Sequence, residues 1–416
     1  MNTTKRHLFF VIHCIVVLFV FSGCNSDSKD STATVIDLSN GVQTVNELDL
    51  SDFASSVRYV KLETSDENIL GEITKVMYED EMILISDNQE KHVFVFNKDG
   101  SFKQKVGKIG QGPEEYVKLS WFDYLPKNNE ILIQSYSWNA HFYDLEGNFR
   151  NKFDFKQLSE NNPTISGLPF RIMYINPSTY AVDINIGGTP LSKLTVINSA
   201  QEILLDIPNE KPFVFDFGEL GAILGTIRVP ETDVVLYRNK DKIVHYGLYE
   251  DTIRIIDNKW NVKYMEFNFG NYKYNGSNEK FFRVQEMLEF SNSLLLKFEA
   301  RGLSPEPFDY NSRGSRGMTI TSHDILGIYD KKTGELVFLK QPQQGKLGFK
   351  NNIDGGLPFW PKSITSRDEM ITYYHADEFI EAFQGKEDAP KEVKAILKDL
   401  KEDEDNPVIA IATPRK

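Results

Sequence analysis

A pattern of four short strands that repeats along the chain constrains the fold more than any other feature of this sequence. In its clearest copy, the predicted strands span residues 73–78, 82–86, 92–96 and 102–106. Each run is rich in β-branched or aromatic residues and ends at turn residues. Gly100 supplies the positive φ that the tight turn between the third and fourth strands requires. A four-stranded antiparallel unit that recurs in this way predicts the blades of a β-propeller.

The same sequence pattern marks four further copies of the four-stranded unit downstream. In every copy an aromatic residue or Ile precedes Asn or Asp at the end of the third strand. These pairs are Phe96-Asn97, Tyr143-Asp144, Ile197-Asn198, Ile256-Asp257 and Tyr329-Asp330. The five copies are predicted to occupy residues 73–106, 121–155, 172–207, 234–269 and 284–339.

A sixth copy is complete only if the two ends of the chain share it. Residues 362–365, 370–374 and 408–412 supply three strands, and residues 58–62 are available as the outer one. This pairing would close the ring and remove the open strand edges that otherwise promote aggregation. The sequence therefore predicts an all-β fold, a six-bladed β-propeller of four-stranded antiparallel blades, over residues 57–416.

One segment of the last blade is predicted to be helical. Val393, Ile396, Leu397 and Leu400 form an apolar stripe at helical spacing in an otherwise charged stretch. Pro390 suits the first turn of such a helix. We therefore expect a small C-terminal helical insertion in this blade.

The N-terminal residues have the pattern of an export signal. Lys5 and Arg6 precede an apolar run, residues 8–21, that is too short for a stable membrane span. Cys24 follows two small residues, which looks like a bacterial lipoprotein signal. On that interpretation residues 1–23 are the signal peptide and Cys24 is lipidated. The alternative is an ordinary secretory signal with a chance cysteine.

Cysteine content agrees with lipidation. Of the two cysteines, Cys14 leaves with the signal, so the mature chain keeps only Cys24 and forms no internal disulfide. An acylated N-terminal cysteine anchors a protein to a membrane without spanning it. Residues 24–56 are then a lipidated tether with a short N-terminal strand. The expected location is the outer membrane, either periplasmic or surface-exposed.

The charge of the chain argues against one class of partner. It has 47 basic and 60 acidic residues, for a net charge of −13. Nucleic-acid binding requires clustered Lys and Arg. No nucleic-acid partner is therefore expected.

Five segments of the chain match motifs of a known group: residues 60–64, 83–87, 93–100, 107–116 and 406–409. In these segments the chain resembles the six-bladed β-propeller lipoproteins of Bacteroidetes, which are distantly similar to NHL-repeat propellers. The resemblance implies the fold and a location in the cell envelope. It implies no activity, because most of that family has none assigned.

The sequence contains no recognisable catalytic or metal-binding set. The loop Gly107–Pro113 lacks the ending of a P-loop and precedes a strand, which favours a corner between blades over a phosphate site. The histidines of the mature chain lie outside the predicted channel-lining strands, and none has the spacing of a metal pair. They are His92, His141, His245, His323 and His375. Neither a metal nor a cofactor is expected, and a sequence-distant Ser-His-Asp triad stays open.

The positions of the longer connections between strands predict which face of the propeller binds a ligand. Extra length lies between the second and third strands of a blade or between blades, and both connections emerge on the same face of a propeller. Long loops on a rigid scaffold are the usual place for a binding site. Aromatic and Arg side chains in or beside these loops suit sugar rings, peptides and carboxylates. The candidates are Tyr136, Trp138, Tyr249, Arg301, Arg313, Arg316 and Trp360. The alternative for Trp138 and Trp360 is packing between loops.

The sequence thus predicts a membrane-anchored propeller that binds a glycan or a cell-envelope protein through its long-loop face. No catalysis is identified. One alternative is a metal-dependent lyase or hydrolase with its centre at the channel mouth. Another is a purely structural subunit of an envelope complex, which the sequence does not separate from a binding protein.

Overall fold

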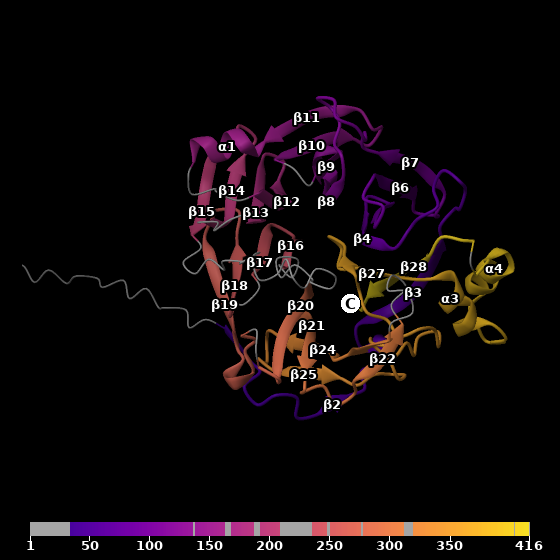
Figure 1. The fold of residues 1–416 in the computed structure, drawn as a ribbon. Coiled ribbons are helices and arrows are strands. Elements are labelled where there is room, and N and C mark those ends of the chain that lie inside the picture. The colour runs from indigo at the N-terminus through magenta and orange to yellow at the C-terminus, as the bar shows by residue number, and fades with distance from the viewer. Residues whose placement is uncertain are drawn as a thin grey trace, which may run out of the picture. The chain divides into compact units, whose positions relative to one another are not determined.

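Short runs of β-branched and aromatic residues, separated by turns, form strands throughout the chain. This computed structural model describes residues 34–135, 138–162, 168–186, 192–208, 235–247, 250–275, 278–311, 319–402 and 404–415. Six sheets of four or five strands stand in a ring around one axis (Figure 1). The predicted six-bladed β-propeller is confirmed.

Blades I to V each come from one stretch of the chain, and their strands follow the chain order from the central channel to the rim. Blade I contains β4 (Ile73–Glu79), β5 (Met82–Asp87), β6 (Val93–Asn97) and β7 (Phe102–Val106), and blade II contains β8 (Leu119–Leu125), β9 (Glu130–Ser135), β10 (Asn139–Asp144) and β11 (Phe149–Asp154). Blade III contains β12 (Leu168–Asn176), β13 (Thr179–Ile186), β14 (Ser192–Asn198) and β15 (Ile203–Pro208), and blade IV contains β16 (Val235–Asn239), β17 (Lys242–Tyr246), β18 (Thr252–Ile256) and β19 (Val262–Asn268). Blade V contains β20 (Phe281–Phe290), β21 (Ser293–Arg301), β24 (Asp324–Asp330) and β25 (Leu336–Leu339).

Blade VI joins the two ends of the propeller. Its strands are β26 (Ser363–Ile364), β27 (Met370–Tyr374), β28 (Val408–Pro414) and, outermost, β3 (Ala54–Lys61). β3 pairs antiparallel with β28, and Val60 lies opposite Ile409. The predicted closure of the ring is therefore confirmed.

Two blades carry a fifth strand that the repeat pattern does not show. β1 (Thr34–Asp37) pairs in parallel with β19, and β2 (Val45–Asn46) pairs in parallel with β25. Ile36 of β1 is fully buried in the core between blades IV and V, which explains why this segment docks. From Thr34 onwards the predicted tether thus follows the rim of the propeller.

The remaining elements lie in connections. The α-helices are α1 (Phe155–Asn161), α3 (Ala376–Phe383) and α4 (Lys391–Asp399). The short 3₁₀ helices are η1 (Leu50–Asp52), η2 (Pro126–Asn128) and η4 (Gly270–Tyr272). A hairpin consists of β22 (Phe308–Asn311) and β23 (Thr319–Ser322). α3 and α4 confirm the predicted helical insertion, and they lie at the outer edge of blade VI beside β3 (Figure 1). There Tyr59 contacts Phe379, with ring centroids 5.1 Å apart. Within the described ranges, no helix is long and apolar enough to cross a membrane.

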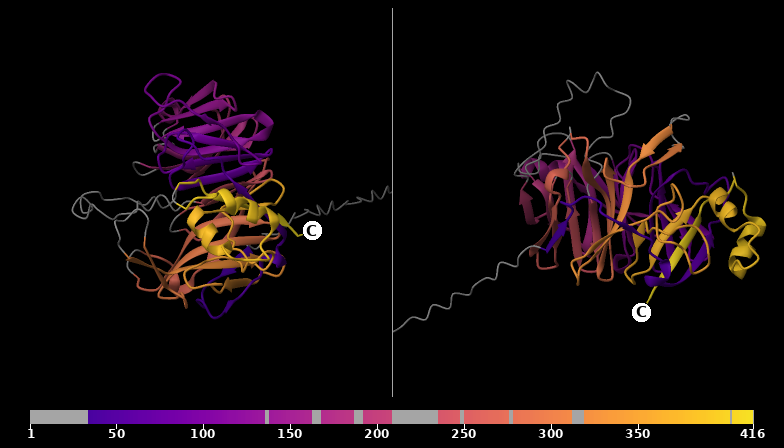
Figure 2. Two further views of the ribbon diagram at one scale, coloured as in Figure 1. Left: turned by 90° about the vertical axis from the view of Figure 1, so that its right-hand side faces the viewer. Right: turned by 90° about the horizontal axis from the view of Figure 1, so that it is seen from below.

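The two faces of the ring differ in their connections. First-to-second and third-to-fourth strand connections are short turns, which lie together on what we call the short-turn face. The other connections emerge on the opposite, long-loop face, where the β22–β23 hairpin projects from the disc (Figure 2). The segment that follows Gly107 is one of these connections. It leads directly into β8, as expected for a corner between blades.

The apolar core is divided among the junctions between neighbouring blades. Six clusters of buried side chains occur among the described residues, and each combines residues of two adjacent blades. Blades V and VI share the one that also holds α3 and α4. Because each blade packs on both of its faces, side chains of the inner strands alternate between two neighbours. The channel is therefore bordered by strand edges and by polar side chains.

Candidate functional site

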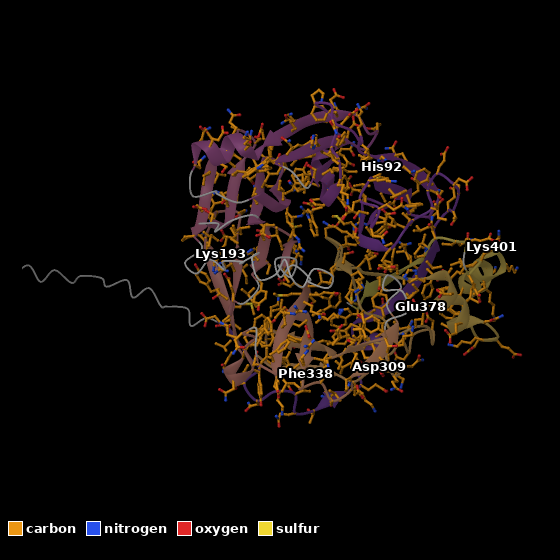
Figure 3. All side chains as sticks on the ribbon, viewed as in Figure 1. His92, Lys193, Asp309, Phe338, Glu378 and Lys401 are labelled. Atoms are coloured by element: carbon orange, nitrogen blue, oxygen red, sulfur yellow. The ribbon has the colours of Figure 1, made fainter. Side chains whose placement is uncertain are left out.

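A cavity of about 1000 Å³ lies at the centre of the ring. All six inner strands contribute to its wall, namely β4, β8, β12, β16, β20 and β26. Figure 3 shows the described side chains on the ribbon of the whole ring. Turn residues such as Asp80, Lys127 and Lys240 also line the cavity, so it extends to the short-turn face.

The wall of this cavity is strongly charged. Its basic residues are Lys75, Lys127, Arg171, Arg238, Lys240 and Lys362. Its acidic residues are Glu79, Asp80, Asp123, Asp241, Glu286, Glu289 and Asp368. Apolar residues such as Val76, Met173 and Met287 lie among them, so the cavity offers a ligand both charged groups and apolar surface.

Asp123 joins three blades through a buried network. Its carboxylate oxygen Oδ2 accepts hydrogen bonds from the Tyr174 backbone N–H and from Arg238 Nη1, both at 2.9 Å. Arg238 also donates to the carbonyl oxygens of Tyr174 at 2.9 Å and Tyr124 at 3.0 Å. These backbone groups belong to β8 and β12, which are the inner edges of their sheets. The network thus satisfies strand edges that no neighbouring strand covers.

Trp121 lies between two cations from neighbouring blades. Lys75 Nζ is 3.6 Å from the centroid of the Trp121 ring, and the guanidinium carbon of Arg171 is 4.8 Å from it. Lys75 Nζ also donates to the Phe122 carbonyl oxygen at 2.5 Å. The indole Nε1 of Trp121 is buried and has no hydrogen-bond partner within the described part of the chain. We call Lys75, Trp121 and Arg171 the indole site.

The Lys75 ammonium is poorly stabilised in this site. Burial lowers the pKa of Lys75 to about 7. Attraction to Asp123 opposes this shift, whereas repulsion from Arg238 and Arg171 adds to it. Near neutral pH the lysine is therefore a mixture of amine and ammonium. An additional negative charge beside it would favour the ammonium form.

On the side of blades V and VI, the cavity wall contains a carboxylate that is paired with cations of the protein, unlike the ammonium of Lys75. Glu286 carries an ion pair with Lys362 at 3.3 Å and another with Lys297 at 3.7 Å. Burial alone raises the pKa of Glu286, but the two ammonium groups outweigh burial and lower it below its ordinary value. This carboxylate is thus already compensated by protein cations.

A third carboxyl group lies at the short-turn end of the cavity. Glu79 accepts hydrogen bonds from the Ser366 backbone N–H at 2.7 Å and the Ser366 hydroxyl at 2.8 Å. Burial raises the pKa of Glu79 despite these bonds. Its contacts connect blade I to blade VI.

The described residues offer no obvious metal site. Across the described ranges, no group of three His, Cys, Asp or Glu side chains is close enough to hold a metal ion. The histidines all lie outside the inner strands: His92, His141, His245, His323 and His375. What the channel wall does offer is cationic groups, an aromatic face and a buried N–H donor.

The predicted ligand-binding residues are only partly described. Tyr136, Tyr249, Arg313 and Arg316 lie outside the described residues. The other three belong to different parts of the ring, and their role in binding stays a prediction.

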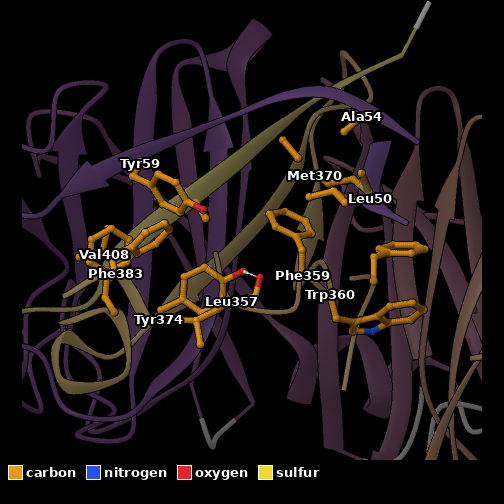
Figure 4. Packing of buried hydrophobic residues seen from close by; sticks show 14 of the residues in the cluster. Leu50, Ala54, Tyr59, Leu357, Phe359, Trp360, Met370, Tyr374, Phe383 and Val408 are labelled. Carbon is orange, nitrogen blue, oxygen red and sulfur yellow. Dashed lines mark hydrogen bonds between the residues drawn. The ribbon is translucent and has the colours of Figure 1, made fainter. Parts of the chain in front are cut away.

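Trp138 is half-buried against the core between blades II and III. Arg301 has a side chain that is 57% exposed and forms an ion pair with Glu299 at 3.1 Å. Trp360 is 7% exposed and lies in the apolar cluster between blades V and VI (Figure 4), 5.6 Å from Phe349 between ring centroids. Arg301 is thus the most accessible of these three.

The sequence analysis did not single out the residues of the indole site. Lys75 and Arg171 are charged residues within largely apolar inner strands. This local pattern is a signal by which residues that line the channel could be found in the sequence. Strand prediction alone, however, does not show that residues from blades I, II and III meet at one indole.

Comparison with known proteins gives a family. The model of a domain of unknown function, DUF4934, matches residues 33–413. The chain belongs to the DUF4934 family. Among curated proteins, none matches its sequence.

Solved structures resemble this DUF4934 chain along nearly its whole length. A protein from Bacteroides fragilis, described by its name as exported, has a TM-score of 0.63 and 14% identity, covering 92% of this chain and 100% of its own. A member of the DUF4221 family from Bacteroides vulgatus has a TM-score of 0.50 and 10% identity, covering 89% of this chain and 99% of its own. At such identities the likeness shows the fold alone. It agrees with the expected resemblance to Bacteroidetes propellers.

Proposed function

We propose that this chain is an exported, membrane-anchored binding protein that takes a segment of a glycan or of an envelope protein into its central channel. The observation that carries this proposal is the cavity of about 1000 Å³, whose charged wall comes from all six inner strands. The sequence analysis favoured the long-loop face instead. The channel has the better support because it combines a concave shape with convergent polar groups.

Export and anchoring are supported by two observations. The N-terminal residues have the pattern of a lipoprotein signal that ends at Cys24. A Bacteroides protein with a similar fold is described by its name as exported. Replacing the cysteine (Cys24→Ala) should release the protein from the membrane fraction and abolish labelling with a radioactive fatty acid. Unchanged labelling and fractionation would contradict the lipid anchor.

The channel proposal is tested by obstructing the channel. Thr74 lines the cavity with an exposed side chain, so Thr74→Trp places an indole in the cavity. The matched control is Thr333→Trp, at an exposed turn of blade V. Binding of neutral oligosaccharides, acidic oligosaccharides and short peptides to the full exported protein would be measured by calorimetry.

We expect Thr74→Trp to weaken binding of whichever probe is taken up by about tenfold or more, because the cavity loses volume. Thr333→Trp should bind like the parent protein. Equal binding by both variants would assign the ligand to another surface, with Arg301 on blade V as the next candidate.

An enzyme is the second candidate, and Lys75 is the observation that favours it. With a pKa of about 7, its amine can act as a general base at neutral pH. The guanidinium of Arg171 lies on the same indole and suits a carboxylate on a substrate. A lyase or hydrolase acting on an acidic substrate would use these groups. Product formation that Lys75→Met abolishes without loss of substrate affinity would distinguish this enzyme from a binding protein.

A further inference from the structure

Charged groups of three neighbouring strands act on the Lys75 ammonium of β4. Asp123 of β8 attracts it, whereas Arg238 of β16 and Arg171 of β12 repel it. A negatively charged group of a ligand beside Lys75 would offset this repulsion.

The one carboxylate of this group is engaged elsewhere. Asp123 forms its ion pair with Arg238 at 2.9 Å, and Arg238 also donates to two backbone carbonyl oxygens. In the described part of the chain no carboxylate forms an ion pair with Lys75. Besides the attraction to Asp123, the ammonium is stabilised by the Trp121 and Phe122 rings and by one carbonyl oxygen.

Hydrogen-bond donors converge at the same place. The buried Nε1–H of Trp121 has no acceptor among the described residues. A buried donor without a partner costs free energy that a bound acceptor recovers. Lys75 retains further ammonium donors, since its one hydrogen-bond acceptor in the described part of the chain is the Phe122 carbonyl oxygen.

We infer that the indole site binds an oxyanion of the ligand, a carboxylate or a sulfate group, with Lys75 as the ion-pair partner and Trp121 Nε1 as a hydrogen-bond donor. This inference rests on the proposed channel function and names the chemistry that the channel recognises. Uronic acids and sulfated sugars carry such groups on glycans. Acidic side chains and chain termini supply carboxylates on proteins.

Oxyanion binding is coupled to a proton. Without ligand, Lys75 is about half protonated at pH 7, because its pKa is about 7. The anion binds the ammonium form, so binding draws on the order of half a proton from the buffer at that pH. Affinity is therefore highest below pH 7 and falls as the pH rises and the lysine loses its charge.

The test uses three probes with the full exported protein: sodium glucuronate, sodium sulfate and glucose. Neither anion titrates between about pH 6 and pH 8, so pH changes act on the protein alone. Calorimetry in buffers of different ionisation enthalpy reports both the affinity and the proton uptake. We expect the affinity for at least one anion to fall about tenfold between pH 6 and pH 8.

Three variants assign the effect to Lys75. Lys75→Met retains the apolar stem and should lose about tenfold or more in anion affinity. Lys75→Arg retains a permanent charge, so it should bind the anion with no proton uptake and little dependence on pH. Lys263→Met, at an exposed position on rim strand β19, should bind like the parent protein.

The outcomes separate this inference from the proposed function. Binding of glucuronate would show that the site recognises a carboxylate. Binding of sulfate alone would show that it recognises a sulfate group. Both support the inference. Glucose binding that Thr74→Trp abolishes, without anion binding, would retain the channel function and overturn the oxyanion site. Anion affinity that is independent of pH or unchanged in Lys75→Met would overturn it as well.

Discussion

At the scale of residues, the channel wall has two kinds of polar group. Asp123 and Arg238 pair with each other and form hydrogen bonds to the exposed edges of inner strands, so their role is to hold blades together. Lys75 and Trp121 also line the cavity, and among the described residues Lys75 has no carboxylate in an ion pair and Trp121 Nε1 has no acceptor, so we assign both to ligand binding. Neighbouring residues of β8 therefore serve stability and binding separately.

Removal of the Asp123 carboxylate should destabilise the protein strongly. Its side chain is fully buried, and Asp123→Ala leaves the Arg238 guanidinium buried without its partner. Breaking a buried pair in this way costs about 3–5 kcal/mol of unfolding free energy. Chemical denaturation measures the loss, with Arg238→Met and the double variant completing a cycle. The double variant should lose less than the sum of the single ones. A loss below about 1 kcal/mol in Asp123→Ala would contradict a structural role.

At the scale of elements, the N-terminal segment is part of the propeller rim. β1 extends blade IV, and β2 extends blade V, each in parallel with the outermost strand of the repeat. Parallel edge pairing covers strands that would otherwise be exposed at the rim. The segment thereby links blades IV and V to blade VI, where the chain continues as β3.

Two adjacent residues of β1 test this docking. Ile36 is 0% exposed and Val35 is 48% exposed. Ile36→Ala should lower the free energy of unfolding by about 2–5 kcal/mol through lost contacts and a cavity. Val35→Ala should change it by less than about 0.5 kcal/mol. Thermal or chemical denaturation measures both, and equal small effects would mean that β1 does not dock in solution.

Local chemistry explains which elements the sequence predicts. Strand runs and turns such as Asn97–Gly100 are defined by neighbouring residues, so the blades and their order are predictable. The pairing of β3 with β28 follows from the count of strands and the need to close a ring. Docking of β1 depends on a distant groove, and its few residues show no periodic signal. The indole site requires the ring itself, since β4, β8 and β12 each supply one residue.

At the scale of the whole molecule, closure through β3 and β28 makes blade VI depend on both ends of the chain. In blade I, by contrast, the four strands come from one continuous stretch, residues 73–106. The contacts in blade VI include the Val60–Ile409 pair and the core shared with blade I. Because these contacts join distant segments, blade VI is expected to be released only when the ring opens as a whole.

Hydrogen exchange tests the closure. Peptides that cover β3 (Ala54–Lys61) should exchange no faster than those that cover β7 (Phe102–Val106), the outermost strand of blade I. Both should follow global unfolding as denaturant is added. Exchange of β3 through a separate opening of much lower free energy would indicate that the ring is only loosely closed.

The most direct measurement on the channel is a crystal structure of the full exported protein with bound selenate, an anomalously scattering analogue of sulfate. The account predicts an anomalous selenium peak in the central cavity, with selenate oxygens within hydrogen-bonding distance of Lys75 Nζ and Trp121 Nε1. The peak should be absent from crystals of Lys75→Met. Selenate bound only at the outer surface, together with no glucuronate beside Trp121 in crystals soaked with that anion, would contradict the assignment of the channel as an oxyanion-binding site.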